Sequence, residues 1–241
     1  ITGPASDITV RDIAGATDDD LVSFTGRDYA SYELTAGGGS ISNVVVENVN
    51  QGSVGVTNAV KLLPGAAMTL SDVAVRNVTI GVATGVGVSI LSDTVNASTI
   101  GGTIRNVSID GVRCGSSSAV DVAHPAVNGL SISNVAMTEN TAGRAISFNQ
   151  AGTTVTDVVI DKLAVVSGYT RPMIHFGSGA TVTSLKVSNV NAPLGAGGTH
   201  GLDRQRAEQR QRDVGACVRR RAVRGHAPLP LVGVTAVIVR D

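Results

Sequence analysis

Three observations predict that this 241-residue chain is an all-β solenoid. Its apolar residues alternate with polar ones at a period of two, which indicates strands. The same alternating segment recurs seven times, with starting points 23 to 36 residues apart, a spacing typical of solenoids. Aromatic residues make up only 2% of the chain and 29 residues are glycine, so thin aliphatic layers with tight corners are expected rather than an aromatic core.

Each repeat contains a segment of the form apolar-x-apolar-x-Asn/Asp-apolar. The seven segments are 7–13, 43–49, 72–78, 106–112, 129–135, 157–163 and 184–190. Their second, fourth and seventh residues are expected to form three inward columns, with Val46, Val75 and Ile109 in one of them. The sixth residues are Asp12, Asn48, Asn77, Gly111, Asn134, Lys162 and Asn189. Because Asn and Gly tolerate left-handed backbone geometry, this column is expected to mark a bend, and stacked Asn side chains can bond along the axis.

A second, shorter strand is predicted in most repeats. These strands are 21–24, 60–63, 88–91, 120–123, 146–149 and 174–177. Their outward column is expected to be Ser23, Lys61, Ser89, Asp121, Ser147 and His175. Two or three strands per repeat, Gly-rich corners and no helical periodicity predict an all-β, right-handed parallel β-helix of about seven coils. A β-sandwich is the alternative.

Charge divides the chain into three predicted parts. Residues 1–199 carry a net charge of −5 and are expected to form the β-helix, whereas residues 200–241 carry +5. Residues 200–231 are Arg-rich and aperiodic, which predicts a poorly ordered basic segment or one decoded out of frame, and 232–241 again resemble a strand. The acidic body gives no reason to expect nucleic acid. No apolar run approaches ~18 residues, so no membrane-spanning helix is expected.

An acidic cluster provides the main chemical signal. Asp18, Asp19 and Asp20 stand directly before the strand at 21–24. Adjacent carboxylates repel one another, and this suits general acid–base work or a Ca²⁺ site. A solvated acidic turn is the structural alternative.

The segment ITVRDIAGATDDDLVSF resembles a coil of the polygalacturonase-type glycoside hydrolases (family 28), within the pectin-lyase-like parallel β-helix proteins. The resemblance implies that Asp19 and Asp20 are the catalytic pair, with Asp18 in the place of the family's glycine. It implies a secreted, extracellular enzyme that cleaves an acidic polysaccharide without a cofactor.

The sequence departs from the family pattern in three places. The family's Asn-Thr-Asp motif would precede Ile1, which predicts an N-terminally truncated fragment. The coil after the Asp pair lacks the histidine of the family's Gly-His-Gly turn. Ala59, Val60 and Lys61 only partly match its Arg-Ile-Lys motif. The hydrolase is therefore expected of the intact parent, and part of its site is expected to be missing here.

Three further residues are predicted to contact the glycan. Lys61 is expected to lie beside the Asp cluster and to bind a uronate carboxylate, and Tyr29 and Tyr32 to stack on a sugar ring; Asp18 is placed with them. Two alternatives remain open: a lyase using Ca²⁺ at Asp18, Asp19 and Asp20, and a non-catalytic tailspike-like or adhesin-like module that binds polysaccharide.

Overall fold

The computed structural model describes residues 1–26, 38–51, 57–65, 67–81, 85–92, 101–115, 118–139, 143–149, 152–169 and 171–191. These residues form strands and turns and contain no helix, so the protein is all-β in the part described. Accordingly, no helix of the described part is long and apolar enough to cross a membrane. The predictions for 200–231 and 232–241 lie outside the described residues, and the division at residue 199 stays a prediction.

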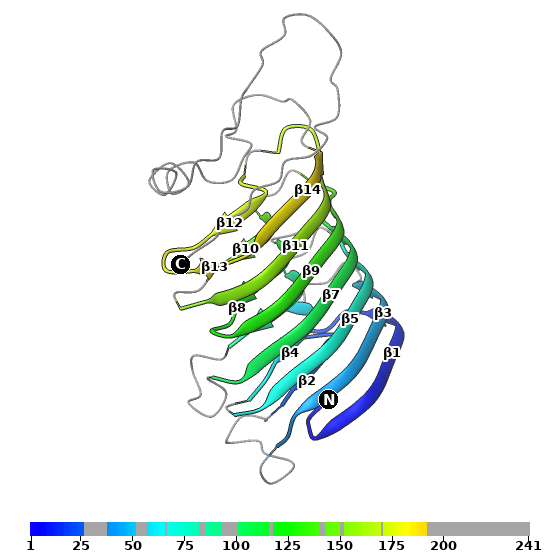
Figure 1. Cartoon of the computed structure of the whole chain (residues 1–241). Coiled ribbons are helices and arrows are strands. Elements are labelled where there is room, and N and C mark those ends of the chain that lie inside the picture. Colours follow the sequence, from blue (N-terminus) through cyan, green and yellow to red (C-terminus); the bar gives the residue numbers. More distant parts are fainter. Residues whose placement is uncertain are drawn as a thin grey trace, which may run out of the picture.

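Two parallel sheets are built by alternate strands of the chain (Figure 1). The first sheet has eight strands in the order β1-β3-β5-β7-β9-β11-β13, with β14 also paired to β11. Its strands are β1 (Ala5–Gly15), β3 (Ile41–Gln51), β5 (Thr69–Ile80), β7 (Thr103–Cys114), β9 (Val127–Met137), β11 (Thr154–Val165), β13 (Thr181–Val182) and β14 (Leu185–Asn191). Each sequence repeat therefore contributes a neighbouring strand, as the spacing of the repeats predicts.

The second sheet has six shorter strands in the order β12-β10-β8-β6-β4-β2. They are β2 (Val22–Thr25), β4 (Asn58–Leu63), β6 (Val86–Leu91), β8 (Ser118–Ala123), β10 (Arg144–Phe148) and β12 (Ile174–Phe176). All six correspond to the short strands predicted from the sequence. Alternation between the two sheets, one long and one short strand per repeat, is the pattern expected of a parallel solenoid.

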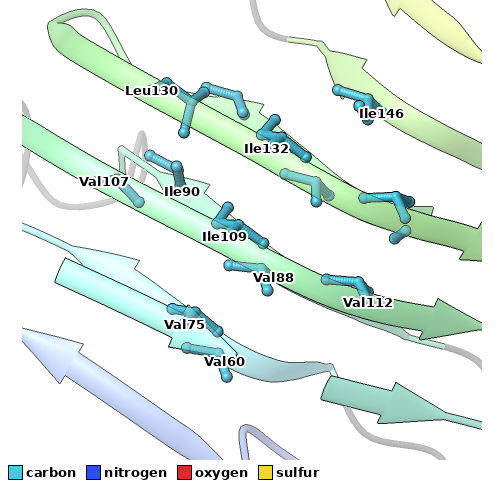
Figure 2. Packing of buried hydrophobic residues seen from close by; sticks show 14 of the residues in the cluster. Val60, Val75, Val88, Ile90, Val107, Ile109, Val112, Leu130, Ile132 and Ile146 are labelled. Carbon is cyan, nitrogen blue, oxygen red and sulfur yellow. The ribbon is translucent and has the colours of Figure 1, made fainter. Parts of the chain in front are cut away.

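The core lies between the two sheets, where aliphatic side chains from both point toward one another (Figure 2). Val46 pairs with Val75, and Val75 pairs with Ile109, so the predicted inward column is correct. All three side chains are fully buried. The matching residues of β1 are only partly buried because β1 is the outermost strand of its sheet. At the opposite end the rings of Phe148 and Phe176 stack with centroids 5.3 Å apart.

The predicted bend column is also correct. All of its residues have a positive φ: Asp12, Asn48, Asn77, Gly111, Asn134, Lys162 and Asn189. Asn48 donates a hydrogen bond to Asp12 at 2.8 Å, and Asn77 donates one to Asn48 at 3.2 Å. These side chains bond along the stack as the sequence predicts. Lys162 is the one member of this column that is not Asn, Asp or Gly, and a lysine side chain does nothing to favour a positive φ.

A second bend column, which the sequence analysis missed, lies five residues earlier in each long strand. Its members are Asp7, Asn43, Asp72, Asn106, Gly129, Asp157 and Ser184, all with positive φ. Asn43 donates to Asp7 at 2.5 Å and Asn106 donates to Asp72 at 2.9 Å. These hydrogen bonds lower the pKa of both aspartates. Each of the six long strands from β1 to β11 thus bends twice, and in the last repeat Ser184 lies between β13 and β14.

Candidate functional site

The Asp cluster is positioned by the pairing of β2 with β4. Ser23 is the register partner of Lys61, so Lys61 lies one strand from the predicted site, as expected. Two backbone hydrogen bonds fix the turn before β2 against the start of β4: Leu21 N donates to Asn58 O at 3.1 Å, and Thr57 N donates to Asp19 O at 3.3 Å. The side chain of Asp20 is therefore held beside the polar residues of β4.

Asp20 makes contacts with two donors on β4. Lys61 Nζ donates to Asp20 Oδ2 at 2.8 Å, and Asn58 Nδ2 donates to Asp20 Oδ1 at 2.6 Å. The side chain of Asp20 is only 6% exposed and that of Lys61 14%. A carboxylate this poorly hydrated is stabilised by a cation and a second donor, since burying an unpaired charge is unfavourable. Both residues were predicted for the site, and the structure brings them together.

Asn58 and Ser89 extend this contact across a third strand. Ser89 Oγ donates to Asn58 Oδ1, and both residues are buried. Sequence reasoning missed both side chains in this role. The available signal was the strand register, because Ser89 on β6 is the partner of Lys61, and β4 begins with Asn58 whereas its neighbours β2 and β6 both begin with Val. We call Asp20, Asn58, Lys61 and Ser89 the Asp20–Lys61 cluster.

Asp18 and Asp19 are placed differently from Asp20. Both residues are exposed. Thr17 Oγ1 donates to Asp19 O at 2.7 Å and accepts from Asp19 N at 3.0 Å, which closes the turn locally. Their carboxylates make no hydrogen bond or ion pair within the described part of the chain. One side of the acidic cluster is thus solvated, while Asp20 faces the sheet.

The remaining site predictions concern two tyrosines and a Ca²⁺ site. Tyr29 and Tyr32 lie outside the described residues. Across the described ranges, no group of three His, Cys, Asp or Glu side chains could hold a metal ion, and this includes the proposed Ca²⁺ ligands Asp18, Asp19 and Asp20.

A row of polar side chains continues from the cluster along the outer face of the six-stranded sheet, the face turned away from the core. Strand register places its members next to one another in the order Ser23, Lys61, Ser89, Asp121, Ser147 and His175. Neighbouring members are one strand spacing apart, ~4.8 Å. The predicted order of this column is correct, but its exposure is only partly so: Ser89 and Ser147 are fully buried, and the other four members are half-buried.

His124 lies outside this row, in the turn between β8 and β9. Its ring is fully buried, and its Nδ1 accepts a hydrogen bond from Ala126 N at 3.0 Å. Its Nε2 has no hydrogen-bond partner among the residues described. Burial lowers the pKa of His124 to about 4. These contacts describe a neutral structural histidine rather than a ligand or an acid–base group.

The burial of His124 predicts that the protein becomes less stable as the pH is lowered. The unfolded chain binds a proton at His124 near pH 6.5, whereas the folded chain does so only near pH 4. The free energy of unfolding therefore decreases progressively as the pH is lowered from about 6.5 to 4, and the total decrease is on the order of 3 kcal/mol. Urea unfolding at several pH values measures it. The His124→Asn protein keeps an acceptor for Ala126 N, and its unfolding free energy should change less over this window. Equal slopes in the two proteins would contradict the assignment.

No family model, curated protein or solved structure matches this chain.

Proposed function

We propose that this chain belongs to a secreted protein that acts on polysaccharides, and that its two sheets close into a right-handed parallel β-helix of about seven coils. The preferred activity is glycoside hydrolysis of the polygalacturonase type on an acidic polysaccharide in the intact parent. The supporting observation is the polar row on the outer face of the six-stranded sheet, which begins at the Asp20–Lys61 cluster. A linear polymer lying along this row would meet Lys61 near one end and Asp121 and His175 further along, while Ser89 and Ser147 are fully buried.

The chemistry assigned to the site uses the two neighbouring aspartates. In hydrolysis one carboxylic acid donates its proton to the glycosidic oxygen, and the bond from that oxygen to the anomeric carbon breaks. Water attacks the anomeric carbon, and its proton passes to the second carboxylate. Asp20 is oriented by Lys61 and Asn58, whereas Asp19 is exposed to solvent. In this proposal Lys61 and Asp18 contact the substrate, and Tyr29 and Tyr32 stack on it.

A second candidate function, binding without cleavage, is favoured by one specific contact. The Asp20 carboxylate already has a cation and an amide donor, which is the set of partners expected of a structural ion pair. A non-catalytic module would use the same polar row to hold a glycan. The partner proposed in either case is a polysaccharide, with neither nucleic acid nor membrane expected.

The deciding experiment compares products formed from polygalacturonate and from neutral polysaccharides. New reducing ends indicate a hydrolase, and an unsaturated product that forms only with Ca²⁺ indicates a lyase. Binding with neither product indicates the module. No binding and no product with any of these polymers would contradict the proposal.

If cleavage is observed, Asp20→Asn and Asp19→Asn should each reduce it by at least about 100-fold, because each removes a proton-transfer group. Asp157→Asn is the matched control: Asp157 is exposed on the other sheet and has a positive φ that asparagine tolerates. The folding of Asp20→Asn must be verified by circular dichroism and urea unfolding, since this change leaves Lys61 without its carboxylate. Full activity in both variants would show that the aspartates are not catalytic.

A further inference from the structure

One carboxylate on the outer face of the eight-stranded sheet is bound by two donors of the next strand. Asp110 on β7 is the register partner of Ser133 on β9. Its Oδ1 atom accepts a hydrogen bond from Ser133 Oγ at 2.6 Å and another from Asn134 Nδ2. Both donors reach the same oxygen, so the three side chains join two neighbouring repeats outside the aliphatic core.

The same arrangement recurs two strands further along the sheet. Asp161 on β11 is the register partner of Ser188 on β14. Its Oδ1 atom accepts hydrogen bonds from Ser188 Oγ and from Asn189 Nδ2, both at 2.7 Å. We call these two groups the carboxylate clamps, each made of one aspartate and the Ser-Asn pair of the next repeat. The function proposed above gives them no role.

Other neighbouring strands of this sheet are joined differently. Asp7, Asp12 and Asp72 each accept one amide hydrogen bond from the next long strand. Between β9 and β11, which lie between the two clamps, no side-chain hydrogen bond or ion pair is formed by the residues that the structure describes. That pair of strands is held by its backbone ladder and by the aliphatic core.

The surroundings of Asp110 favour its ionised form. Hydrogen bonds from its two donors lower the pKa of the carboxyl group. Two positive charges, Lys162 on β11 and Arg76 on β5, also lower it, whereas burial acts in the opposite direction. Arg76 in turn contacts Glu47 on β3 at 4.0 Å. The register partner of Asp110 on β9 is an uncharged serine.

Asp161 has similar surroundings. Its two donors lower its pKa, and Lys162 beside it acts in the same direction. Its register partners on β9 and β14 are both uncharged serines. An aspartate whose pKa is lowered by folding adds stability above its ordinary pKa of 3.8, and this stability is lost as the pH falls below that value.

We propose that the two carboxylate clamps form an acid-sensitive conformational device, which holds β9 on β7 and β14 on β11 only while Asp110 and Asp161 are ionised. Hydrogen bonds to a carboxylate are roughly twice as strong as those to a neutral acceptor. Protonation leaves the same donors opposite each aspartate but removes the charge that strengthens the bonds. Acid therefore loosens the stack at two defined places, while the contact between β9 and β11 contains no such bond.

The first test compares urea unfolding of three proteins at about pH 4.5 and 2.5. Asp110→Asn/Asp161→Asn keeps an acceptor oxygen for all four donors and cannot ionise. On acidification its unfolding constant should rise about 10-fold less than that of the parent. Asp157→Asn is the matched control, because Asp157 is exposed and makes no hydrogen bond in the described part of the chain, and it should follow the parent. Equal pH dependence in the parent and the double variant would overturn the inference.

Removing the serine donors gives an independent thermodynamic signature. Ser133→Ala/Ser188→Ala takes one hydrogen bond from each ionised carboxylate, so its urea midpoint should be lower than that of the parent at pH 7. At pH 2.5 the two midpoints should be nearly equal, because the charge-strengthened bonds are then absent from both proteins. An equal loss at both pH values would show that the serines stabilise the fold without any dependence on ionisation, against the inference.

The place of loosening is tested with pepsin, a protease that works in acid. At pH 2.5 the parent should be cut within β14 about 10-fold faster than Asp161→Asn, because cleavage follows the population of the opened strand. Mass spectrometry of the fragments locates the cuts. Equal rates in the two proteins would show that Asp161 does not control this contact. None of these measurements uses a glycan, so their outcomes are independent of the proposed function.

Discussion

Val75→Asp is expected to lower the free energy of unfolding by more than about 4 kcal/mol, or to prevent folding. Val75 is fully buried between Val46 and Ile109, in the middle of the aliphatic column between the sheets. A carboxylate there has no cation or donor within the column, and the neighbouring layers cannot move apart without opening two further repeats.

Urea unfolding followed by circular dichroism measures this effect. Ala74→Asp is the matched control, because Ala74 is the adjacent residue of β5 and alternates to the outer face, between Val45 and Ser108. It should lower the unfolding free energy by less than about 1 kcal/mol, as is usual for surface changes. Similar losses in the two proteins would contradict the assignment of the core.

Lys61→Met is expected to lower the free energy of unfolding by about 3 kcal/mol, the second largest effect. The change leaves the Asp20 carboxylate, 6% exposed, with Asn58 as the remaining side-chain donor among the residues that the structure describes. The double variant Asp20→Asn/Lys61→Met should recover most of the loss, because it removes both charges together. A double-mutant cycle in urea measures the coupling between the two sites. Additive losses in the cycle would show that the 2.8 Å contact contributes nothing to stability.

Much of the fold could be predicted from the sequence because the repeat imposes the same environment on each column. A valine at the fourth position of one segment pairs with the valine or isoleucine of the next, so one correct alignment places all of them. The second bend was missed because its column mixes Asp, Asn, Gly and Ser, and only the torsion angles show that Asp157 and Ser184 share a conformation with Gly129.

The candidate site could be predicted less completely. Register brings Lys61 beside the strand that follows the Asp cluster, and this follows from the repeat alone. The direction of each carboxylate does not follow from it: Asp20 turns toward β4 whereas Asp18 and Asp19 turn to solvent. Three identical residues in a row carry no pattern that distinguishes them. The roles assigned to all three remain predictions.

The parallel register of both sheets also determines where unfolding of the protein should begin. Among the described strands, the main contacts join each repeat to the one before and the one after it, so folding stability is a chain of nearest-neighbour terms. An interior strand such as β5 is held from two sides and β1 from one. Fraying should therefore begin at β1 and move inward one repeat at a time, with amide protection rising from β1 to β5. A stack of repeats of this kind can unfold its end repeat while the central repeats stay folded.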